Sequence, residues 1–311
     1  MDIIGKRNIF FATSGILVLM SVVAVLIFGF RPGIDFVGGT LWQIKQATDH
    51  SRQTTAQENE AVVRSPLAAD SLKEFFEKDL NEKNVTIFPS DNQSFLIRLR
   101  HLNESEHRSE LERLKVKFGD IQELRFAGIG PAIGRELRGR AFWAIGFVLL
   151  GISLYIAFVF RRVSYPIKSW KYGVVTLVTL FHDIAIPAGM LAFLGLRLGV
   201  EVDTNFVVAL LVIMGFSVHD TIVVFDRIRE NLTRERGRLD LASVINQSIN
   251  QTLARSVNTS LTLILVLLAL FFFGPVILKY FVLTIIVGTI IGTYSSIFIA
   301  SPSLLLIRGK Y

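Results

Sequence analysis

The chain alternates between long apolar runs and short polar segments, and this pattern predicts most of its architecture. A membrane-spanning helix needs about 20 predominantly apolar residues. Six runs have this length: Ile9–Phe30, Ala141–Phe160, Tyr172–Leu196, Thr204–Phe225, Ser256–Leu278 and Tyr280–Ile307. The pattern therefore predicts an α-helical membrane protein with six transmembrane helices.

One polar region, Arg31–Arg140, is long enough to form a folded domain. Its apolar positions alternate in some segments and recur at helical spacing in others. The predicted strands are Thr40–Gln46, Val85–Phe88, Ser94–Arg100 and Ile121–Phe126, and the predicted helices run from Ser65 to about Glu82 and from Asn103 to Gly119. The resulting order, β-α-β-β-α-β, is that of an α+β ferredoxin-like sandwich.

Local signals predict how these helices begin and end. Ser65 followed by Pro66 is typical of a helix start. Asn103 with Glu106 three residues later predicts a capping box, and Gly119 predicts the end of the same helix. The polar stretch Ala47–Arg64 between the first strand and the first helix predicts a loose loop.

Two further polar segments connect the apolar runs. Ala127–Arg140 contains glycine, proline and a basic turn, which predicts a bending linker at the membrane interface. Asp226–Arg255 is polar, with apolar residues at helical spacing between Leu241 and Leu253. That spacing predicts a helix lying along the membrane surface before the fifth span begins.

Basic residues predict the orientation of the spans, because short cytoplasmic loops carry an excess of Lys and Arg. They gather at both ends of the chain and in the loops after the second and fourth spans: Lys6, Arg7, Arg161, Arg162, Lys168, Lys171, Arg227, Arg229, Arg234, Arg236, Arg238, Arg308 and Lys310. The other short loops carry only Arg197 and Lys279. Both termini are predicted to be cytoplasmic.

This orientation predicts three regions of a multi-pass protein of the cytoplasmic (inner) membrane. Residues 1–30 form the cytoplasmic N-terminus and first helix, 31–140 the extracytoplasmic domain and linker, and 141–311 a five-helix bundle with a cytoplasmic C-terminus. The first apolar run exceeds the roughly 7–15 residues of a signal-peptide core, so we interpret it as a retained span.

Composition narrows the classes of protein. Of the 311 residues, 51% are hydrophobic and 19% are charged, whereas globular domains carry about 25% charged residues. The chain has no cysteine, which excludes disulfides and thiolate metal sites. No cofactor and no nucleic-acid partner are expected, and membrane lipid is predicted to surround the apolar runs.

Two adjacent His-Asp pairs lie inside the apolar runs: His182 with Asp183, and His219 with Asp220. Ionisable residues within a span are costly and by default indicate a proton, ion or substrate pathway. Histidine titrates near neutral pH when unperturbed, which makes His219 a natural proton relay. The pairs lack the number and spacing of ligands that a metal site requires.

Five motifs in order resemble the SecF members of the SecD/SecF family, in the resistance-nodulation-division superfamily. They are GIDFVGGT, GPAIGRELRGRA, FHD, GFSVHDTIVVFDRIREN and NQTLARSVNTSLT. The resemblance covers essentially the whole chain. It implies a membrane subunit that uses proton flow to promote protein export, with a SecD-type subunit, the SecYEG channel and preprotein substrates as partners.

The resemblance also implies roles for individual residues. The family carries its essential proton-handling aspartate at the position of Asp220 and a functional arginine at that of Arg255. At the position of His219 the family commonly has asparagine, and at that of Val37 it usually has threonine. His219 therefore adds a titrating group whose role the resemblance does not define.

The residues themselves leave some roles open. A static packing pair is the alternative to a relay for Asp220 and Arg255. Structural hydrogen bonding is the alternative to proton transfer for His182 and Asp183, since neighbours on a helix point about 100° apart. The coupling ion is a proton or sodium.

The glycine-rich motif Gly33, Asp35, Gly38 and Gly39 predicts a rigid turn after the first span. A phosphate-binding loop is the competing interpretation, but no GK[ST] signature follows.

Other classes of function are less consistent with the sequence. Exporters of small molecules or lipids in the same superfamily usually duplicate the six-span unit, and this chain holds one. Intramembrane aspartyl proteases use a GxGD pattern, which does not precede Asp220. A purely structural scaffold leaves both His-Asp pairs unexplained. The chain is therefore predicted to be a proton-coupled translocation subunit and not an enzyme.

Overall fold

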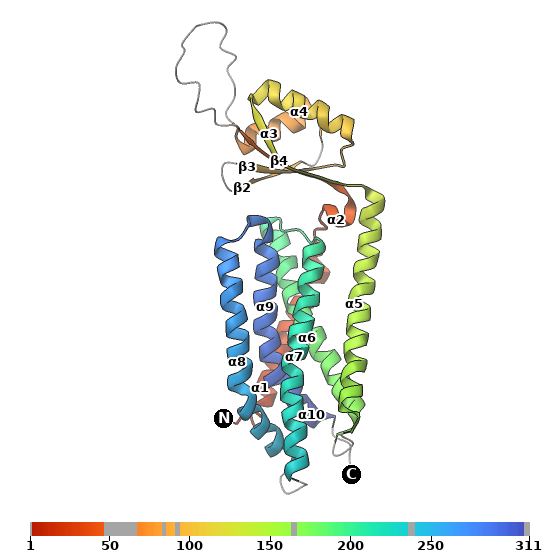
Figure 1. Ribbon diagram of the computed structural model, residues 1–311, viewed down its shortest axis with the longest axis vertical. Helices are drawn as coiled ribbons and strands as arrows, with labels where there is room; N and C mark the ends of the chain where they lie inside the picture. The colour runs from red at the N-terminus through yellow and green to blue at the C-terminus, as the bar shows by residue number, and fades with distance from the viewer. Residues whose placement is uncertain are drawn as a thin grey trace. The chain divides into compact units, whose positions relative to one another are not determined.

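The computed structural model describes residues 2–46, 67–82, 85–90, 94–162, 167–235 and 240–307. The chain divides into two compact units, each described here by itself. The helical unit comprises Met1–Arg31 and Arg140–Tyr311, and the sheet domain comprises Pro32–Gly139. Figure 1 labels their helices and strands.

Six helical segments are long and apolar enough to cross a membrane, which confirms the predicted fold class. Their bounds are α1 Arg7–Phe28, α5 Pro131–Val159, α6 Ser169–Leu198, α7 Thr204–Glu235, α8 Leu241–Phe273 and a sixth segment, Val276–Leu306. The sixth segment changes its winding along its length: η4 Val276–Leu278, α9 Lys279–Ser295, the π-helical η5 Ser296–Ala300 and α10 Ser301–Leu306. A short 3-10 helix, η3 Phe160–Arg162, follows α5.

The helical unit is built around α6, α7 and α9, which pack against one another. Helix α1 lies along α6, and α8 lies along both α7 and α9. At one end of the unit Phe160, Tyr172 and Phe225 form an aromatic cluster, in which Phe160 and Tyr172 stack with ring centroids 4.9 Å apart. The central position of α6 and α7 buries the spans that carry the two His-Asp pairs.

The sheet domain has the predicted β-α-β-β-α-β order. Its elements are α2 Ile34–Val37, β1 Gly39–Gln46, α3 Ala69–Glu74, η1 Phe75–Asp79, β2 Thr86–Ser90, β3 Ser94–Leu99, α4 Glu104–Phe118 and β4 Ile121–Ile129. The strands form one antiparallel sheet in the order β2-β3-β1-β4, which is the order of a ferredoxin-like sandwich. Figure 1 shows α3 and α4 over the same face of this sheet.

The helices are held on the sheet by an apolar core. Trp42 from β1 lies against Phe76 of η1, edge to face, and Leu114 and Phe118 of α4 are also buried in this core. The predicted capping box of α4 is present: the Asn103 side chain accepts from the Glu106 N–H, and the Glu106 carboxylate accepts from the Asn103 N–H.

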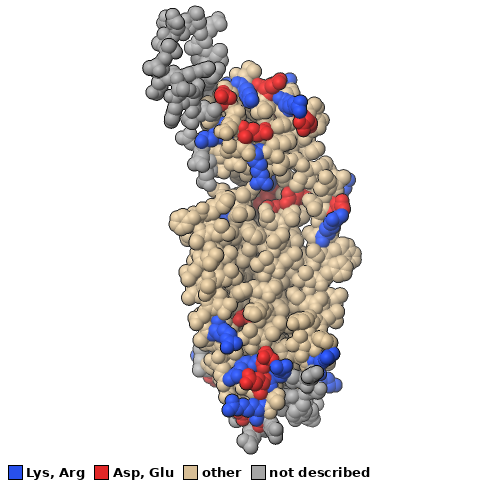
Figure 2. All heavy atoms as spheres, in the orientation of Figure 1, with Lys and Arg blue, Asp and Glu red and all other residues tan. Residues whose placement is uncertain are grey.

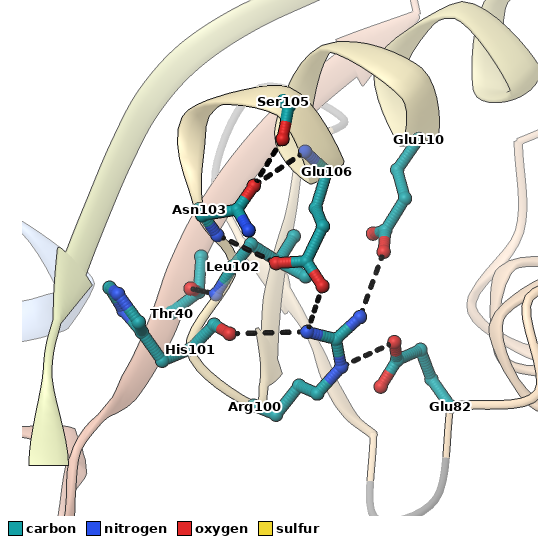
Figure 3. A network of polar contacts seen from close by, with 9 residues as sticks. All are labelled: Thr40, Glu82, Arg100, His101, Leu102, Asn103, Ser105, Glu106 and Glu110. Atoms are coloured by element: carbon teal, nitrogen blue, oxygen red, sulfur yellow. Dashed lines mark hydrogen bonds and ion pairs between the residues drawn. The ribbon is translucent and has the colours of Figure 1, made fainter.

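One guanidinium joins three segments of the sheet domain (Figure 3). Arg100, just after β3, pairs with Glu82 Oε1 at 2.8 Å and with Glu106 Oε1 at 2.7 Å. A third carboxyl, Glu110, is 3.9 Å from the same guanidinium and is almost fully buried. Burial, together with the nearby Glu82 and Glu106 and against the opposing effect of Arg100 and Arg113, raises the pKa of Glu110 to about 7.

The predicted bending linker Ala127–Arg140 is wrong. Its first residues continue β4 to Ile129, and α5 begins at Pro131, one residue later. The proline occupies the first helical position, where its missing N–H costs nothing. The glycine and proline thus mark a junction between strand and helix, and the second span is ten residues longer at this end than the apolar run.

The predicted surface helix between Leu241 and Leu253 is also wrong as a separate element, because α8 runs without interruption from Leu241 to Phe273. Its apolar residues form a face buried in the helical unit. The predicted helix start at Ser65-Pro66 and the predicted loop Ala47–Arg64 lie outside the described residues, and α3 begins at Ala69.

Candidate functional site

Asp183, near the middle of α6, is fully buried and has three side-chain contacts. Its Oδ1 lies 2.8 Å from His182 Nδ1. Its Oδ2 accepts hydrogen bonds from Ser217 of α7 and, at 2.8 Å, from Ser295 of α9. The carboxyl group therefore ties together the three central helices, and His182 pairs with its own neighbour instead of with another helix.

Asp220, one turn after Ser217 on α7, is buried in the same region. Its Oδ2 accepts a hydrogen bond from Ser296. The buried Ser256 hydroxyl of α8 also faces this carboxyl group, but it forms no hydrogen bond of regular geometry with a described residue. Asp220 thus has fewer hydrogen-bond donors than Asp183, although both carboxyl groups are enclosed.

Two glycines of α9 explain why its serines reach these carboxyl groups. A Cβ on Gly292 would lie 3.0 Å from the Ser217 Cβ, and a Cβ on Gly288 would lie 2.3 Å from the end of Ile213. Small residues four apart let helices approach closely within a membrane. Helix α9 therefore lies near enough to α7 for short serine side chains to bridge the gap.

Hydroxyl groups continue beyond the two carboxyl groups, between α8 and α9. Ser260 hydrogen-bonds to Thr293. Thr289, one turn earlier on α9, is buried, and its hydroxyl has no partner among the described residues. This interface therefore offers a polar lining next to Asp220 inside otherwise apolar helices.

The structure does not bring Arg255 and Asp220 together. Arg255 lies on the exposed face of α8, and within the described part of the chain no ion pair joins it to Asp220. His219 is likewise exposed on α7. Of the predicted relay residues, Asp220, His182 and Asp183 are buried in the helical unit, whereas His219 and Arg255 face outward.

The glycine-rich motif forms the one-turn helix α2. Gly33 is its N-cap and Gly38 its C-cap. Gly38 has a φ of 83° and Gly39 a φ of 148°, in the region that favours glycine. A Cβ on Gly38 would lie 2.8 Å from Pro131 Cα. The motif therefore makes a tight turn against the start of α5, and Asp35 lies in the first turn of α2.

Sequence reasoning missed Ser217, Ser295 and Ser296, whose hydroxyl groups donate hydrogen bonds to the two carboxyl groups. Ser295 and Ser296 are a polar pair inside an apolar run, and Ser217 lies three residues before Asp220. That pair and that spacing were the available signals. Among the described residues, no three His, Asp or Glu side chains are arranged to hold a metal ion.

Comparison with known proteins places this chain in a family. The family model "Protein export membrane protein SecD/SecF, C-terminal" matches residues 110–310, and the "SecD/SecF GG Motif" matches residues 23–45. The protein translocase subunit SecF of Thermobaculum terrenum is 44% identical over 97% of this chain and 92% of its own length. That of Anaerolinea thermophila is 35% identical over 98% of this chain and 94% of its own.

A solved structure agrees with these matches. The crystal structure of SecDF, a translocon-associated membrane protein from Thermus thermophilus, superposes with a TM-score of 0.79 at 35% identity. The match covers 98% of this chain but only 38% of that longer one. With the six apolar helices, the chain is a multi-pass protein of the cell membrane. The chain belongs to the SecD/SecF family of protein-export membrane proteins, as a SecF-type subunit of protein translocase.

Proposed function

We propose that this subunit uses the proton-motive force to promote export of preproteins, with Asp220 as the carboxyl group that gains and releases the proton. The observation that carries the proposal is the surroundings of Asp220. The group is buried within a span, and in the described part of the chain no basic side chain forms an ion pair with it. An ionised carboxylate at such a place costs several kcal/mol, so a mobile cation or a proton must neutralise it.

Arg255 is the cation that we assign to this task. It directly precedes Ser256, whose hydroxyl faces Asp220. Successive side chains on a helix point about 100° apart, so a rotation of α8 exchanges Ser256 for Arg255 near the carboxyl group. An approaching guanidinium favours the charged form of Asp220 and releases its proton, and a receding one favours proton uptake.

A SecD-type partner completes the pathway in this proposal. His219, Arg255 and Asn258 are exposed on α7 and α8 although they lie within candidate spans. Polar groups within a membrane usually face a protein partner or a water-filled cavity and not lipid. A partner helix packed against these exposed residues would cover His219. It would also give Arg255 a second set of neighbours besides Asp220. The SecYEG channel and preproteins are the further partners proposed from the family.

Charge placement supports cytoplasmic termini. On the face drawn in Figure 2, Lys and Arg of the helical unit gather at one end of the helices, and most of their length is free of charge. Basic residues at that end include Arg7 at the start of α1, Arg227 and Arg229 near the end of α7, and Lys171 at the start of α6. Lys and Arg favour the cytoplasmic side.

The test compares Asp220→Asn with Asp226→Asn in vesicles that contain the translocase and the SecD-type partner. Asp226 is exposed at the end of α7 and pairs with Arg229, which makes it a matched control. Asp220→Asn should remain folded, inserted and partner-bound while losing proton-dependent stimulation of export. Normal export by Asp220→Asn across a full proton gradient contradicts the proposal. Replacing the proton gradient with a sodium gradient identifies the coupling ion.

A further inference from the structure

Two neighbouring serines of the sixth span contact different carboxyl groups. Ser295, the last residue of α9, donates to Asp183 Oδ2 at 2.8 Å, and Ser296, the first residue of η5, donates to Asp220 Oδ2. Neighbours on a helix point about 100° apart. One side chain therefore reaches α6 while the next reaches α7.

Each of these hydroxyl groups has two acceptors but only one proton to donate. Ser295 Oγ lies 3.0 Å from the Gly292 carbonyl oxygen, and Ser296 Oγ lies 2.9 Å from that of Thr293. A serine hydroxyl is one donor and an acceptor at the same time. Its proton therefore points at the carboxyl group or at the carbonyl group.

Whether the carboxyl group is protonated determines which of these two acceptors the serine proton points at. An ionised Asp220 attracts the Ser296 proton, because a charge-assisted hydrogen bond is about twice as strong as a neutral one. A protonated Asp220 donates through Oδ2 to Ser296 Oγ, and the serine then donates to the Thr293 carbonyl. The proton is added to the carboxyl group, and no covalent bond of the serine breaks. Ser296 thus reverses its hydrogen bond when Asp220 gains or loses a proton.

The winding of the helix at this point is unusual and locally stabilised. Segment η5 is π-helical, and π-helical turns occur frequently at functional sites. The Ser301 hydroxyl donates to the Ser296 carbonyl oxygen at 2.9 Å, which adds a hydrogen bond across the widened turn. Because of this wider turn, the spacing of side chains between Ser295 and the start of α10 differs from that of a regular α-helix.

The two carboxyl groups differ in how completely they are held. Asp183 has contacts with His182, Ser217 and Ser295, which is enough to satisfy a carboxylate from several directions. His182 Nε2 is buried and has no partner among the described residues, so Nδ1 alone connects this ring to the cluster. Asp183 is therefore the fixed member of the pair and Asp220 the one that changes.

We propose that Ser295 and Ser296 are positioning residues that couple Asp220 to Asp183, so that a proton on Asp220 is communicated through the sixth span to the third. This inference rests on the proposed function, because it takes Asp220 as the proton-carrying group. Asp183 connects α6 to Ser295. The adjacent Ser296 changes the direction of its hydrogen bond when Asp220 gains or loses a proton. The proton site thus spans three helices instead of one.

The experiment compares Ser295→Ala and Ser296→Ala with Ser303→Ala in the full chain bound to its SecD-type partner. Ser303 lies in the same span, and its hydroxyl donates only to the Ile299 carbonyl among the described residues. The first readout is the infrared carbonyl band of protonated Asp220, identified by its loss in Asp220→Asn. The second is the pH dependence of proton-driven export.

Ser296→Ala should move the Asp220 carbonyl band to higher wavenumber, because the protonated group loses its acceptor. It should also move the midpoint of both titrations up by about one pH unit, since the ionised form loses a donor. Ser303→Ala should change neither. Ser296→Thr keeps a hydroxyl group and should show the wild-type band and midpoint. This variant separates the loss of the hydroxyl group from a change in folding.

The coupling itself is measured with a double-mutant cycle. Asp183→Asn should shift the Asp220 band in the wild-type background and should shift it less in Ser295→Ala. Equal shifts in both backgrounds, or a Ser296→Ala variant that matches Ser303→Ala in both readouts, overturn the inference. If these results occur while Asp220→Asn abolishes proton-driven export, the proposed function stands. If Asp220→Asn exports normally, the proposed function fails whatever the band shows.

Discussion

Gly38 lies directly against Pro131, so that a Cβ on the glycine would be 2.8 Å from the proline Cα. The contact joins the end of α2 to the first residue of α5. Gly38 also has a φ of 83°, which side chains other than glycine rarely adopt. Both constraints come from the backbone, so no neighbouring side chain can move to relieve them.

Gly38→Ala should therefore destabilise this junction by roughly 1–3 kcal/mol, from overpacking and backbone strain together. The measurement is amide hydrogen exchange of α2 and of the first turn of α5. Gly130→Ala is the matched control, because a Cβ on Gly130 would meet nothing within 4 Å. Equal exchange in the two variants would contradict the prediction.

Glu110 should make the sheet domain less stable at higher pH. Its pKa is raised to about 7 from 4.5, mainly by burial. The folded domain therefore binds a proton that the unfolded chain has released, and stability falls as pH rises from about 4.5 to about 7. Hydrogen exchange of α4, corrected for intrinsic rates and measured at pH 5 and pH 8, should show greater protection at pH 5.

Glu110→Gln should remove most of this difference, because the amide stays neutral at both values. Glu104→Gln is the control, since Glu104 is exposed on the same helix and pairs with Arg108 one turn away. A pH difference that persists unchanged in Glu110→Gln would assign the effect to another group.

The packing of α1 on α6 should depend on Gly189. A Cβ there would lie 2.5 Å from the Ser21 Cα, which is backbone of the facing helix. Gly189→Ala should lower the midpoint of thermal unfolding in detergent, because the two helices must separate, at a cost of roughly 1–3 kcal/mol. Gly15→Ala on α1, where a Cβ would meet nothing within 4 Å, should leave the midpoint unchanged or higher.

The capping box of α4 gives a prediction with a smaller effect. Asn103→Ala removes the side chain that accepts from the Glu106 N–H at 2.9 Å. The loss of an N-cap costs about 1 kcal/mol, and hydrogen exchange should increase in the first turn of α4 while the last turn changes less. Asn103→Ser retains a capping oxygen and should behave like the wild type. A uniform change along α4 would indicate a global effect instead.

The arrangement of helices and strands was predictable because it depends on periodicity. Long apolar runs and alternating segments gave the six spans and the β-α-β-β-α-β order, and Asn103 with Glu106 gave the start of α4. The predicted linker failed because its glycine and proline were interpreted as a bend, whereas Pro131 occupies the first position of α5, where proline is favoured. The surface helix failed because the polar residues between Asn246 and Arg255 concealed its continuity with the fifth span.

The site was predictable only in part. Asp220 and Asp183 were identified because charge inside an apolar run is conspicuous. Ser295 and Ser296 were missed because serine hydroxyls usually bond to their own helix, and only the approach of α9 gives them carboxyl partners. The outward position of Arg255 could not be read from its place in the chain, because one residue of difference on a helix exchanges a buried face for an exposed one.

The π-helical turn makes the length of the sixth span as important as its composition. A π-helical turn holds about one residue more than an α-helical turn, so deleting one residue between Ser296 and Ala300 would restore regular winding without rotating the residues that follow. Leu304, which is buried against the helical unit, would then stay inward, whereas a one-residue deletion within α9 would turn it by about 100°. A genetic screen should consequently recover single-residue deletions within η5 more readily than single-residue deletions within α9.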